Sequence, residues 1–330
     1  MTERIGLLTS GGDAPGMNAA IRAIVRTATE HGIVVVGVRH GYEGLIQGDV
    51  EPLDNRAVGG IIERGGTILR SARSAAFLTE EGQAQALSTV ADQRLDGLIV
   101  VGGNGSLAGA RWLDDHGVPT VGIPASIDND VPETAMAIGV DTALNTVVEC
   151  LNRIRDTAVA HERAFVVEVM GRKSGFIALT GGLAGGAEIV LLPEFPVALS
   201  DIAERVLAGV KLGKKHSIIV VAEGFVPTDE ALDGRSPGRA ITSYLEGCGT
   251  LETRLTILGH LLRGGSPSAF DRVLANRLAE AAVDWLSEGT HGRMAAWVGG
   301  SVVPVPFDRL DAPCHNVDPK LLRLVDIVAH

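Results

Sequence analysis

Short runs of β-branched and other apolar residues recur along most of the chain, each of a length that suits a single strand. Near-continuous apolar runs of this kind are typical of parallel strands that are covered on both faces. We therefore predict strands at Arg4–Thr9, Ile33–Val38, Leu98–Val101, Thr120–Ile123, Ala164–Val169, Ile189–Leu192 and Ser217–Ala222.

Longer amphipathic segments lie between these runs and predict helices. The helices are expected at Asn18–Glu30, Glu80–Gln93, Ala143–Asp156, Ile202–Leu212 and Phe270–Ser287. Strands that alternate with helices indicate βαβ units, so the predicted fold class is α/β with doubly wound, mainly parallel sheets. Residues Thr228–Leu251, rich in Gly, Asp and Pro, are expected to form a loop excursion or a poorly ordered connection.

Composition narrows the class of protein. The 330 residues are enough for about two domains, although no Pro- or Ser-rich linker marks the boundary, which we place near Ala135–Asp141. The net charge of −11 argues against nucleic acid or an anionic membrane surface as partner. The isolated Cys150, Cys248 and Cys314, an N-terminus without a secretory signal and the lack of a membrane-length apolar run predict a cytoplasmic protein.

Two glycine-rich segments follow predicted strands and precede helical patterns. They are Ser10–Asn18, which reads S-G-G-D-A-P-G-M-N, and Gly102–Ser106. Glycines at such a turn let backbone N–H groups approach a phosphate at a helix N-terminus. The alternative is a tight βα turn without a ligand. The P-loop motif is absent, and the second segment does not match the dinucleotide fingerprint.

The segment Ser126–Asp130, S-I-D-N-D, follows the strand at Thr120–Ile123. In open parallel sheets ligands collect beyond the carboxyl ends of the strands, where paired carboxylates can take a proton or orient a metal-bound phosphate. Because Asp and Asn also form turns and cap helices, an ordinary turn is equally compatible with these residues alone.

Arginines stand where an anion site would need them. Arg70 and Arg73 follow Gly65-Gly66, Arg172 ends a predicted strand, and Arg263 lies three residues after His260. The planar guanidinium binds phosphate bidentately and stays charged. A single arginine is most often a solvated surface residue, but several beside glycine loops and strand ends favour a phosphate site.

These segments together resemble the 6-phosphofructokinase family. The matching motifs occur in the family's order and span nearly the whole chain: Thr9–Arg22 (T-S-G-G-D-A-P-G-M-N-A-A-I-R), Gly65–Leu69 (G-G-T-I-L), Ser71–Arg73 (S-A-R), Ser126–Asp130, Val167–Arg172 (V-E-V-M-G-R) and Leu258–Pro267 (L-G-H-L-L-R-G-G-S-P).

The resemblance implies a phosphofructokinase-like homotetramer of two-domain subunits. Residues 1–139 with about 264–310 would form a nucleotide-binding domain, and 140–263 with about 311–330 a fructose 6-phosphate and effector domain. The implied reaction is phosphoryl transfer from ATP to the 1-hydroxyl of fructose 6-phosphate in glycolysis, with Mg²⁺. Asp128 matches the family's general base, Arg172 stabilises the transferred phosphoryl group, and Asp130 positions substrate and metal.

The resemblance also implies binding residues. On the substrate side they are Ser126, Ile127, Asp128, Arg163, Met170, Gly171, Arg172, Glu223, Arg254, His260 and Arg263, of which Arg163 and Arg254 reach the 6-phosphate from a neighbouring subunit. On the nucleotide side they are Gly11, Tyr42, Arg73, Ser74, Gly103, Asn104, Gly105 and Ser106. An effector site for ADP or phosphoenolpyruvate is implied at Arg22, Arg26, Arg56, Arg155, Glu188, Lys214 and Lys215.

This chain departs from the family pattern at three positions. Asn104 replaces an Asp that assists Mg²⁺, Arg70 replaces a usual Gly, and Leu212 replaces a common basic residue of the effector site. Gly105 and Ala125 stand where pyrophosphate-dependent relatives carry Asp and Lys, which favours ATP as donor. A pyrophosphate-dependent enzyme and a low-activity regulatory paralogue that binds the same ligands are the alternatives.

Overall fold

The structure is a computed structural model that describes residues 2–249, 251–314 and 317–329. The chain divides into two compact units. Unit 1 comprises Met1–Thr142 and Arg263–Cys314, and unit 2 comprises Ala143–Leu262 and His315–His330. The chain thus leaves unit 1, forms most of unit 2, and returns to unit 1 before its final segment.

Unit 1 is built on a seven-stranded sheet with the order β11-β10-β5-β4-β1-β2-β3. Strands β1, β2, β4, β5 and β10 run parallel, whereas β3 and β11 are antiparallel edge strands. The strands are β1 (Arg4–Ser10), β2 (Val34–Val38), β3 (Val50–Leu53), β4 (Gly97–Gly102), β5 (Thr120–Pro124), β10 (Arg293–Val298) and β11 (Ser301–Pro306).

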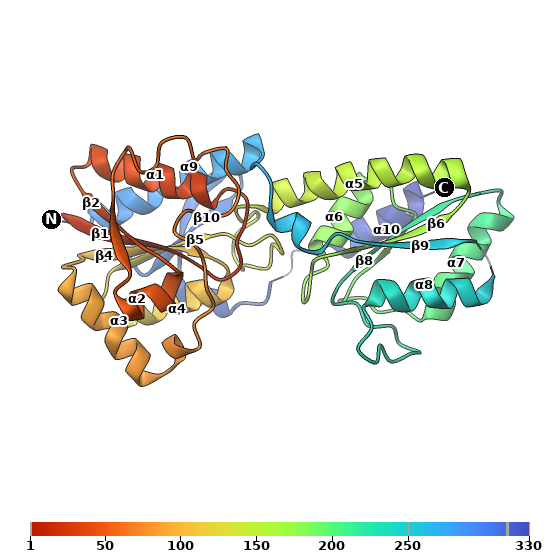
Figure 1. The fold of residues 1–330 in the computed structure, drawn as a ribbon, viewed down its shortest axis with the longest axis horizontal. Helices are drawn as coiled ribbons and strands as arrows, with labels where there is room; N and C mark the ends of the chain where they lie inside the picture. Colours follow the sequence, from red (N-terminus) through yellow and green to blue (C-terminus); the bar gives the residue numbers. More distant parts are fainter. Residues whose placement is uncertain (1, 250, 315–316, 330) are drawn as a thin grey trace. The chain divides into compact units, whose positions relative to one another are not determined.

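Helices cover both faces of this sheet (Figure 1). One face carries α1 (Met17–Glu30) and α9 (Ala269–Ser287), and the other carries α2 (Gly41–Gln47), α3 (Glu80–Asp92) and α4 (Asn104–Asp115). Short 3₁₀ turns η1 (Ala76–Leu78) and η3 (Phe307–Asp311) complete the unit. Leu8, Val36, Leu45 and Leu107 belong to the buried core cluster beneath α2, α3 and α4.

Unit 2 contains a four-stranded parallel sheet with the order β7-β8-β6-β9. Its strands are β6 (Ala164–Val169), β7 (Ile189–Leu191), β8 (Ser217–Ala222) and β9 (Thr253–Ile257). Figure 1 shows α5 (Val140–His161), α6 (Phe176–Ala184) and α10 (Pro319–Val328) on one face and α7 (Leu199–Lys211) and α8 (Pro237–Cys248) on the other. The 3₁₀ turn η2 (Gly259–Arg263) follows β9. The predicted α/β fold class with mainly parallel sheets is therefore confirmed.

The expectation of a loop throughout Thr228–Leu251 was wrong, because α8 occupies its second half. Ser236 caps this helix by accepting a hydrogen bond from the Arg239 amide, and Pro237 occupies its first turn. Glu168, buried in β6, accepts a 2.9 Å hydrogen bond from the Gly238 amide. Gly and Pro at this position thus begin a helix that a strand carboxylate anchors.

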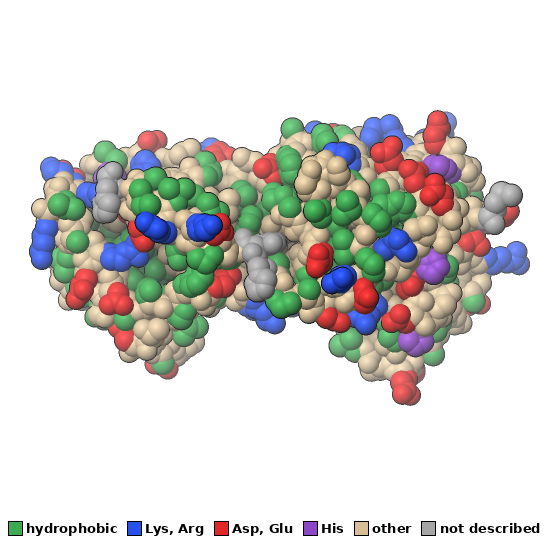
Figure 2. All heavy atoms as spheres, turned by 180° about the vertical axis from the view of Figure 1, so that it is seen from behind, with side chains coloured by type: hydrophobic (Ala, Val, Ile, Leu, Met, Phe, Trp, Pro, Cys, Tyr) green, Lys and Arg blue, Asp and Glu red, His purple; other side chains and the backbone are tan. Residues whose placement is uncertain are grey.

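Among the described residues, no helix is long and apolar enough to cross a membrane. Acidic and basic side chains are interspersed over the face that Figure 2 presents. With an overall charge of −11, a site for an anionic ligand must therefore be formed locally by a few cationic groups.

Asp271, fully buried in the first turn of α9, holds the segment that leads into α5. Its carboxylate accepts hydrogen bonds from the Gly139 amide at 2.9 Å, the Thr142 amide at 2.8 Å and the Thr142 hydroxyl at 2.5 Å. Desolvation raises the pKa of Asp271, and these hydrogen bonds partly oppose the rise. The carboxylate thus satisfies three donors that burial would otherwise leave unpaired.

Asp271→Asn is expected to lower the free energy of unfolding of unit 1 by about 1.5–3 kcal/mol, because an amide NH₂ would face main-chain donors. All three tryptophans, Trp112, Trp285 and Trp297, belong to unit 1, so urea unfolding followed by tryptophan fluorescence measures this unit. The control is Asp284→Asn. Asp284 lies on the same helix as Asp271 but is an exposed partner of His31, so this substitution should lower the free energy of unfolding by less than about 1 kcal/mol. Equal effects of the two substitutions would contradict the anchoring role.

Candidate active site

The loops that follow β2, β1, β4 and β5 lie together at the carboxyl ends of these strands, because the strands are parallel neighbours. This end of the unit 1 sheet is the edge referred to below. The loops carry Tyr42, the Gly11–Gly16 turn, the Gly103–Ser106 turn and the Ser126–Asp130 loop. The first glycine turn ends at Gly16, the N-cap of α1, whereas in the second Gly103 is the N-cap of α4 and Asn104–Ser106 form the first turn of that helix. The structure therefore brings together, along one edge of this sheet, the two glycine-rich segments and the Ser126–Asp130 loop.

The Ser126–Asp130 loop is fixed by Asn129, the residue between its two carboxylates. Asn129 is fully buried and has a left-handed backbone with φ 47°. Its side chain donates to the Ala135 carbonyl and accepts from the Ala137 amide, both at 3.0 Å. Both ends of the Asn129 side-chain amide are thus hydrogen-bonded, which fixes the backbone positions of the neighbouring Asp128 and Asp130.

Asp130 is oriented from two sides. The Ser126 hydroxyl donates to Asp130 Oδ1 at 2.9 Å, and the Asn104 amide nitrogen donates to the Asp130 main-chain carbonyl at 3.0 Å. Asn104 thus turns its NH₂ group toward the loop, which leaves its side-chain oxygen as the end that could bind a cation. The structure places both residues proposed for metal binding beside each other.

The described residues contain no group of three or more His, Cys, Asp or Glu side chains that could hold a metal ion. A divalent ion at this edge would therefore depend on Asp130, the Asn104 oxygen and phosphate oxygens of a bound ligand. Mg²⁺ commonly binds through one or two carboxylates together with substrate phosphates and water. The donor set fits such an ion.

The first glycine turn is packed against Arg263 and Ser71. Arg263 Nη1 donates to the Asp13 carbonyl at 3.0 Å, and a Cβ on Gly12 would lie 2.4 Å from that nitrogen. The Ser71 hydroxyl donates to the Gly11 carbonyl at 2.6 Å. Arg263 is a member of unit 1, so its guanidinium belongs with the glycine turn within this unit.

Tyr42 lies behind the second glycine turn, with its ring in the core. Its hydroxyl donates to the Ser106 carbonyl at 2.6 Å, and its ring stacks on Phe77 with centroids 4.2 Å apart. A side chain at Gly109 would collide with this ring, since a Cβ would lie 2.5 Å from it. Burial raises the pKa of Tyr42. The contacts of Tyr42 thus support the turn and α4 from within the core.

The remaining nucleotide-side residues differ in their surroundings. Arg73 is exposed, and the Ser74 hydroxyl donates to Glu43 at 2.7 Å while accepting from the Phe77 amide. Ser106 is buried, with its hydroxyl 3.2 Å from the position of a Cβ on Gly11. Gly105, by contrast, has open space where a side chain would stand.

In unit 2, most of the predicted substrate residues lie at the carboxyl ends of adjacent parallel strands. Met170, Gly171 and Arg172 follow β6, Glu223 follows β8, and His260 follows β9. The Gly224 amide donates to the Gly171 carbonyl at 3.0 Å, and Gly224 leaves no room for a side chain beside Arg172, whose oxygen would lie 2.0 Å from a Cβ. Gly171 itself has φ 135°, which favours glycine. These loops place Arg172, Glu223 and His260 at one edge.

Arg163 and Arg254 lie on the opposite side of the same sheet, at the amino-terminal ends of its strands. Arg163 directly precedes β6, and Arg254 is the second residue of β9. Arg163 Nε donates to Glu252 at 2.6 Å, and Arg254 forms an ion pair with the same carboxylate. The hydrogen bond from Arg163 is the main cause that lowers the pKa of Glu252. A strand of six residues spans about 20 Å, so these arginines are remote from Arg172 within unit 2.

The proposed effector residues fall into separate groups. In unit 2, Arg155 lies 3.8 Å from Glu188, and Glu188 and Lys214 line one cavity of about 250 Å³, which Leu212 also lines. Lys215 instead pairs with Glu162 at 2.6 Å. In unit 1, Arg22 and Arg26 are one turn apart on α1, and Arg56 is exposed after β3.

The model of the phosphofructokinase family matches residues 4–286 of the chain. The chain belongs to the phosphofructokinase family. The ATP-dependent 6-phosphofructokinase of Brevibacillus brevis is 50% identical over 321 residues, which cover 97% of this chain and 98% of the relative. The ATP-dependent 6-phosphofructokinase 1 of Thermus thermophilus is 50% identical over 330 residues, 99% of each chain.

Solved structures support the same fold. Phosphofructokinase from Saccharomyces cerevisiae superposes with a TM-score of 0.84 at 34% identity, over 99% of this chain and 46% of the yeast chain. The chain therefore spans about half the length of that yeast protein. A pyrophosphate-dependent phosphofructokinase from Marinobacter aquaeolei has a TM-score of 0.86 at 20% identity, over 98% of this chain and 91% of that one, which shows the fold alone.

Sequence reasoning missed several residues of this phosphofructokinase site. The position of Glu252 between two arginines, the hydrogen bonds of Asn129 within its loop, and the contacts of His40 with Arg70 and with Asp49 were not foreseen. A left-handed Asn within a loop that must hold two carboxylates is a signal that could have identified Asn129. The contacts of Arg163 with Glu252 and of Arg70 with His40 join residues 89 and 30 positions apart, and no local sequence pattern predicts them.

Proposed function

We propose that this protein catalyses transfer of the γ-phosphoryl group of ATP to the 1-hydroxyl of fructose 6-phosphate, giving fructose 1,6-bisphosphate and ADP. The observation that carries the proposal is the loop after β5. It holds Asp128 and Asp130 in fixed positions at the sheet edge that also carries both glycine turns. The family membership and the names of the similar relatives described above support the same reaction.

Each of the proposed site residues has a chemistry that suits one role in this reaction. Asp128, with its Oδ1 atom buried, accepts the proton of the attacking hydroxyl. Arg172, exposed after β6, stabilises charge on the transferred phosphoryl group, while Glu223, His260 and Arg263 bind the sugar phosphate. Phosphoryl transfer depends mainly on positioning and on electrostatic stabilisation, which these groups supply.

Mg²⁺ is the expected metal. When bound, it would supply positive charge that offsets the negative charge of the phosphates. Asp130 and the Asn104 oxygen would hold it together with the donor's phosphates. The Ser126 hydroxyl fixes the orientation of the Asp130 carboxylate for that purpose.

Two residues support ATP as donor over pyrophosphate. A Cβ on Gly105 would meet nothing within 4 Å, so the second glycine turn leaves space beside it for the rest of a nucleotide. Ala125 is 1% exposed and uncharged, so it supplies no cation for a pyrophosphate. The positions that carry Asp and Lys in pyrophosphate-dependent relatives are thus small and neutral here.

The proposal is tested by a coupled assay on purified protein with fructose 6-phosphate and either ATP, other nucleoside triphosphates or pyrophosphate as donor. ATP should give the highest kcat/KM. Activity with pyrophosphate but not with ATP would identify pyrophosphate as the donor. Binding of both ligands without turnover under any donor would instead favour the regulatory paralogue.

Asn104→Asp is expected to lower the Mg²⁺ concentration needed for half-maximal activity several-fold, because a carboxylate is a better ligand than an amide for a hard dication. The KM for fructose 6-phosphate should stay unchanged. Asn104→Ala is the control, since it also loses the 3.0 Å hydrogen bond to the Asp130 carbonyl but adds no charge. Identical Mg²⁺ titrations for wild type and Asn104→Asp would remove residue 104 from the metal site.

The assembly and its regulation belong to the same proposal. Arg163 and Arg254 serve the 6-phosphate pocket of a neighbouring subunit in a homotetramer, and Arg155, Glu188 and Lys214 contribute to an effector site for ADP or phosphoenolpyruvate. The position of the two arginines at the edge opposite Arg172 supports this sharing. A cytoplasmic location remains a prediction from the sequence.

A further inference from the structure

Arg70 has a backbone conformation that its side chain does not favour. Its φ is 60°, in the left-handed region that costs a residue with a Cβ roughly 1–2 kcal/mol. The conformation is held from outside, because the Thr9 hydroxyl at the end of β1 donates to the Arg70 carbonyl at 2.7 Å. A glycine would adopt the same φ freely, so an arginine here calls for a reason that lies in its side chain.

The Arg70 side chain is oriented by a chain of two further residues. Its Nη1 lies 3.3 Å from His40 Nε2, and His40 Nδ1 lies 3.1 Å from Asp49 Oδ2. A guanidinium can only donate, so His40 Nε2 accepts and Nδ1 carries the proton that Asp49 accepts. Asp49 therefore sets the tautomer of His40, and His40 holds one edge of the Arg70 guanidinium.

Arg70 and His40 lie at the edge of the unit 1 sheet that carries the two glycine turns. Ser71, the residue after Arg70, donates a hydroxyl hydrogen bond to the Gly11 carbonyl. Gly41, the residue after His40, packs so closely on β1 that a Cβ there would lie 2.8 Å from the Thr9 carbonyl oxygen. Arg70 is exposed, and no carboxylate among the residues that the structure describes forms an ion pair with it. With one N–H group directed to His40, the other donors of the guanidinium remain available to an anion.

We propose that Arg70, positioned by His40 and Asp49, binds the phosphates of the donor nucleotide and sets the affinity for that nucleotide. The inference rests on the proposed function and deepens it. At this edge Asn104 supplies no negative charge, so an added cation at residue 70 attracts a polyphosphate without an opposing carboxylate at residue 104. The unfavourable φ of Arg70 is retained because the guanidinium contributes binding energy that glycine cannot supply.

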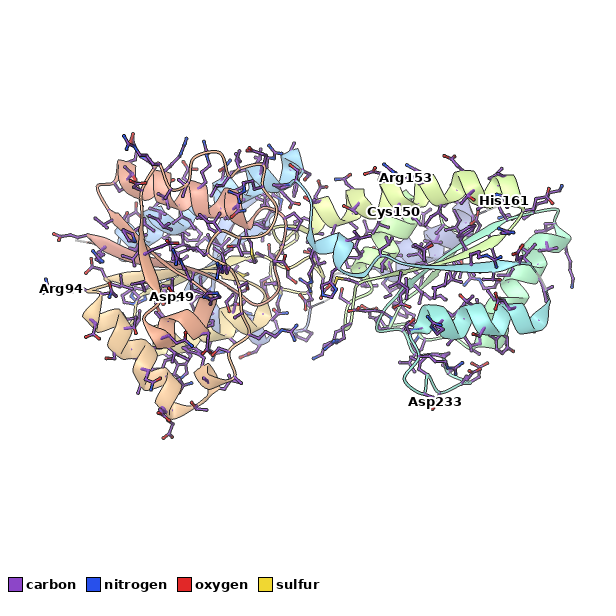
Figure 3. The ribbon with its side chains drawn as sticks, viewed as in Figure 1. Asp49, Arg94, Cys150, Arg153, His161 and Asp233 are labelled. Carbon is purple, nitrogen blue, oxygen red and sulfur yellow. The ribbon has the colours of Figure 1, made fainter. Side chains whose placement is uncertain are left out.

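The test compares Arg70→Gly with Arg94→Gly. Arg94 is also an exposed arginine with a left-handed backbone, φ 51°, and it follows α3 at the edge of unit 1 away from Asp49, as Figure 3 shows. Both substitutions relieve the same backbone strain, but only the first removes the proposed phosphate ligand. Equilibrium binding of ATP, KM for ATP and for fructose 6-phosphate, kcat and melting temperature are measured for each protein.

Arg70→Gly is expected to raise both the Kd and the KM for ATP about ten- to a hundredfold, the usual effect of losing a hydrogen bond between charged groups. Its KM for fructose 6-phosphate should not change, and its melting temperature should not fall. Arg94→Gly should match wild type in all ligand parameters. Asp49→Asn, which leaves Arg70 in place but frees the tautomer of His40, should raise the KM for ATP by a smaller factor at unchanged kcat.

A lowered melting temperature with unchanged ATP binding in Arg70→Gly would overturn the inference and make Arg70 a purely structural residue. Equal rises in KM for Arg70→Gly and Arg94→Gly would also overturn it, because relief of strain would then explain both. Wild-type protein that fails to use ATP is a failure of the proposed function instead, and the binding measurement still reports on Arg70 in that case.

Discussion

Asp128→Ser is expected to lower kcat by at least about 10²–10⁴-fold, the range associated with a positioned proton acceptor. Serine cannot take the proton of the attacking hydroxyl at neutral pH. The equilibrium binding of fructose 6-phosphate should persist, because Arg172, Glu223 and His260 reside on other loops, in unit 2. Steady-state kinetics together with ligand binding by calorimetry check both parts of this expectation.

Asp128→Asn is the matched variant, since it keeps the size and polarity of the side chain and removes only its basicity. A kcat close to that of wild type in either variant would exclude Asp128 as the base. Loss of binding together with kcat would instead indicate that the loop has collapsed. Because Asn129 ties the loop to Ala135 and Ala137 independently of residue 128, we expect the loop to survive.

The sheets could be predicted from the sequence because their strands are local apolar runs. Ser217–Ala222, for example, is buried along its whole length, as an apolar run covered on both faces should be. The Ser126–Asp130 loop could be placed for the same reason, since it directly follows such a run in β5. Strands β3, β9, β10 and β11 were not predicted, because each contains exposed or half-buried residues and its hydrophobic pattern is correspondingly mixed.

The contacts that orient the site could not be predicted in this way. Arg163 and Glu252 are 89 residues apart, and Arg70 and His40 are 30 residues apart, so no local spacing relates them. Exposed polar pairs also leave no hydrophobic period. The orientation of Tyr42 is another example: the resemblance implied a place on the nucleotide side, but no local pattern predicted that its ring packs in the core while its hydroxyl donates to the Ser106 carbonyl.

The position of Glu252 bears on how the active site is completed. One carboxylate holds Arg163 and Arg254 side by side at the amino end of adjacent strands β6 and β9. Arginines brought together in this way present two planar donors to one anion, which suits a phosphate. Since Arg172 lies at the other end of β6, about 20 Å away, one copy of unit 2 cannot use all three arginines on one sugar phosphate.

Mixed assemblies should therefore recover activity from two inactive parents. Asp128→Ser and Arg254→Ser proteins are mixed in equal amounts, dissociated and reassembled, and assayed at limiting fructose 6-phosphate. If each site takes Asp128 from one subunit and Arg254 from its neighbour, half of the sites have Asp128 and half of those have an intact neighbour. The mixture should then regain about a quarter of wild-type activity, as expected for random assembly of a symmetric oligomer.

The control for this experiment is a mixture of Arg163→Ser with Arg254→Ser. Both arginines contact Glu252 within one unit and would reach the same neighbouring pocket, so every site in this mixture keeps one defect and no activity should return. No recovery in the first mixture, although hybrids have formed, would show that a single chain completes its own site. Wild-type-like activity of an isolated monomer would lead to the same conclusion. Recovery in the control would instead show that the Arg163 and Arg254 of one site come from different subunits.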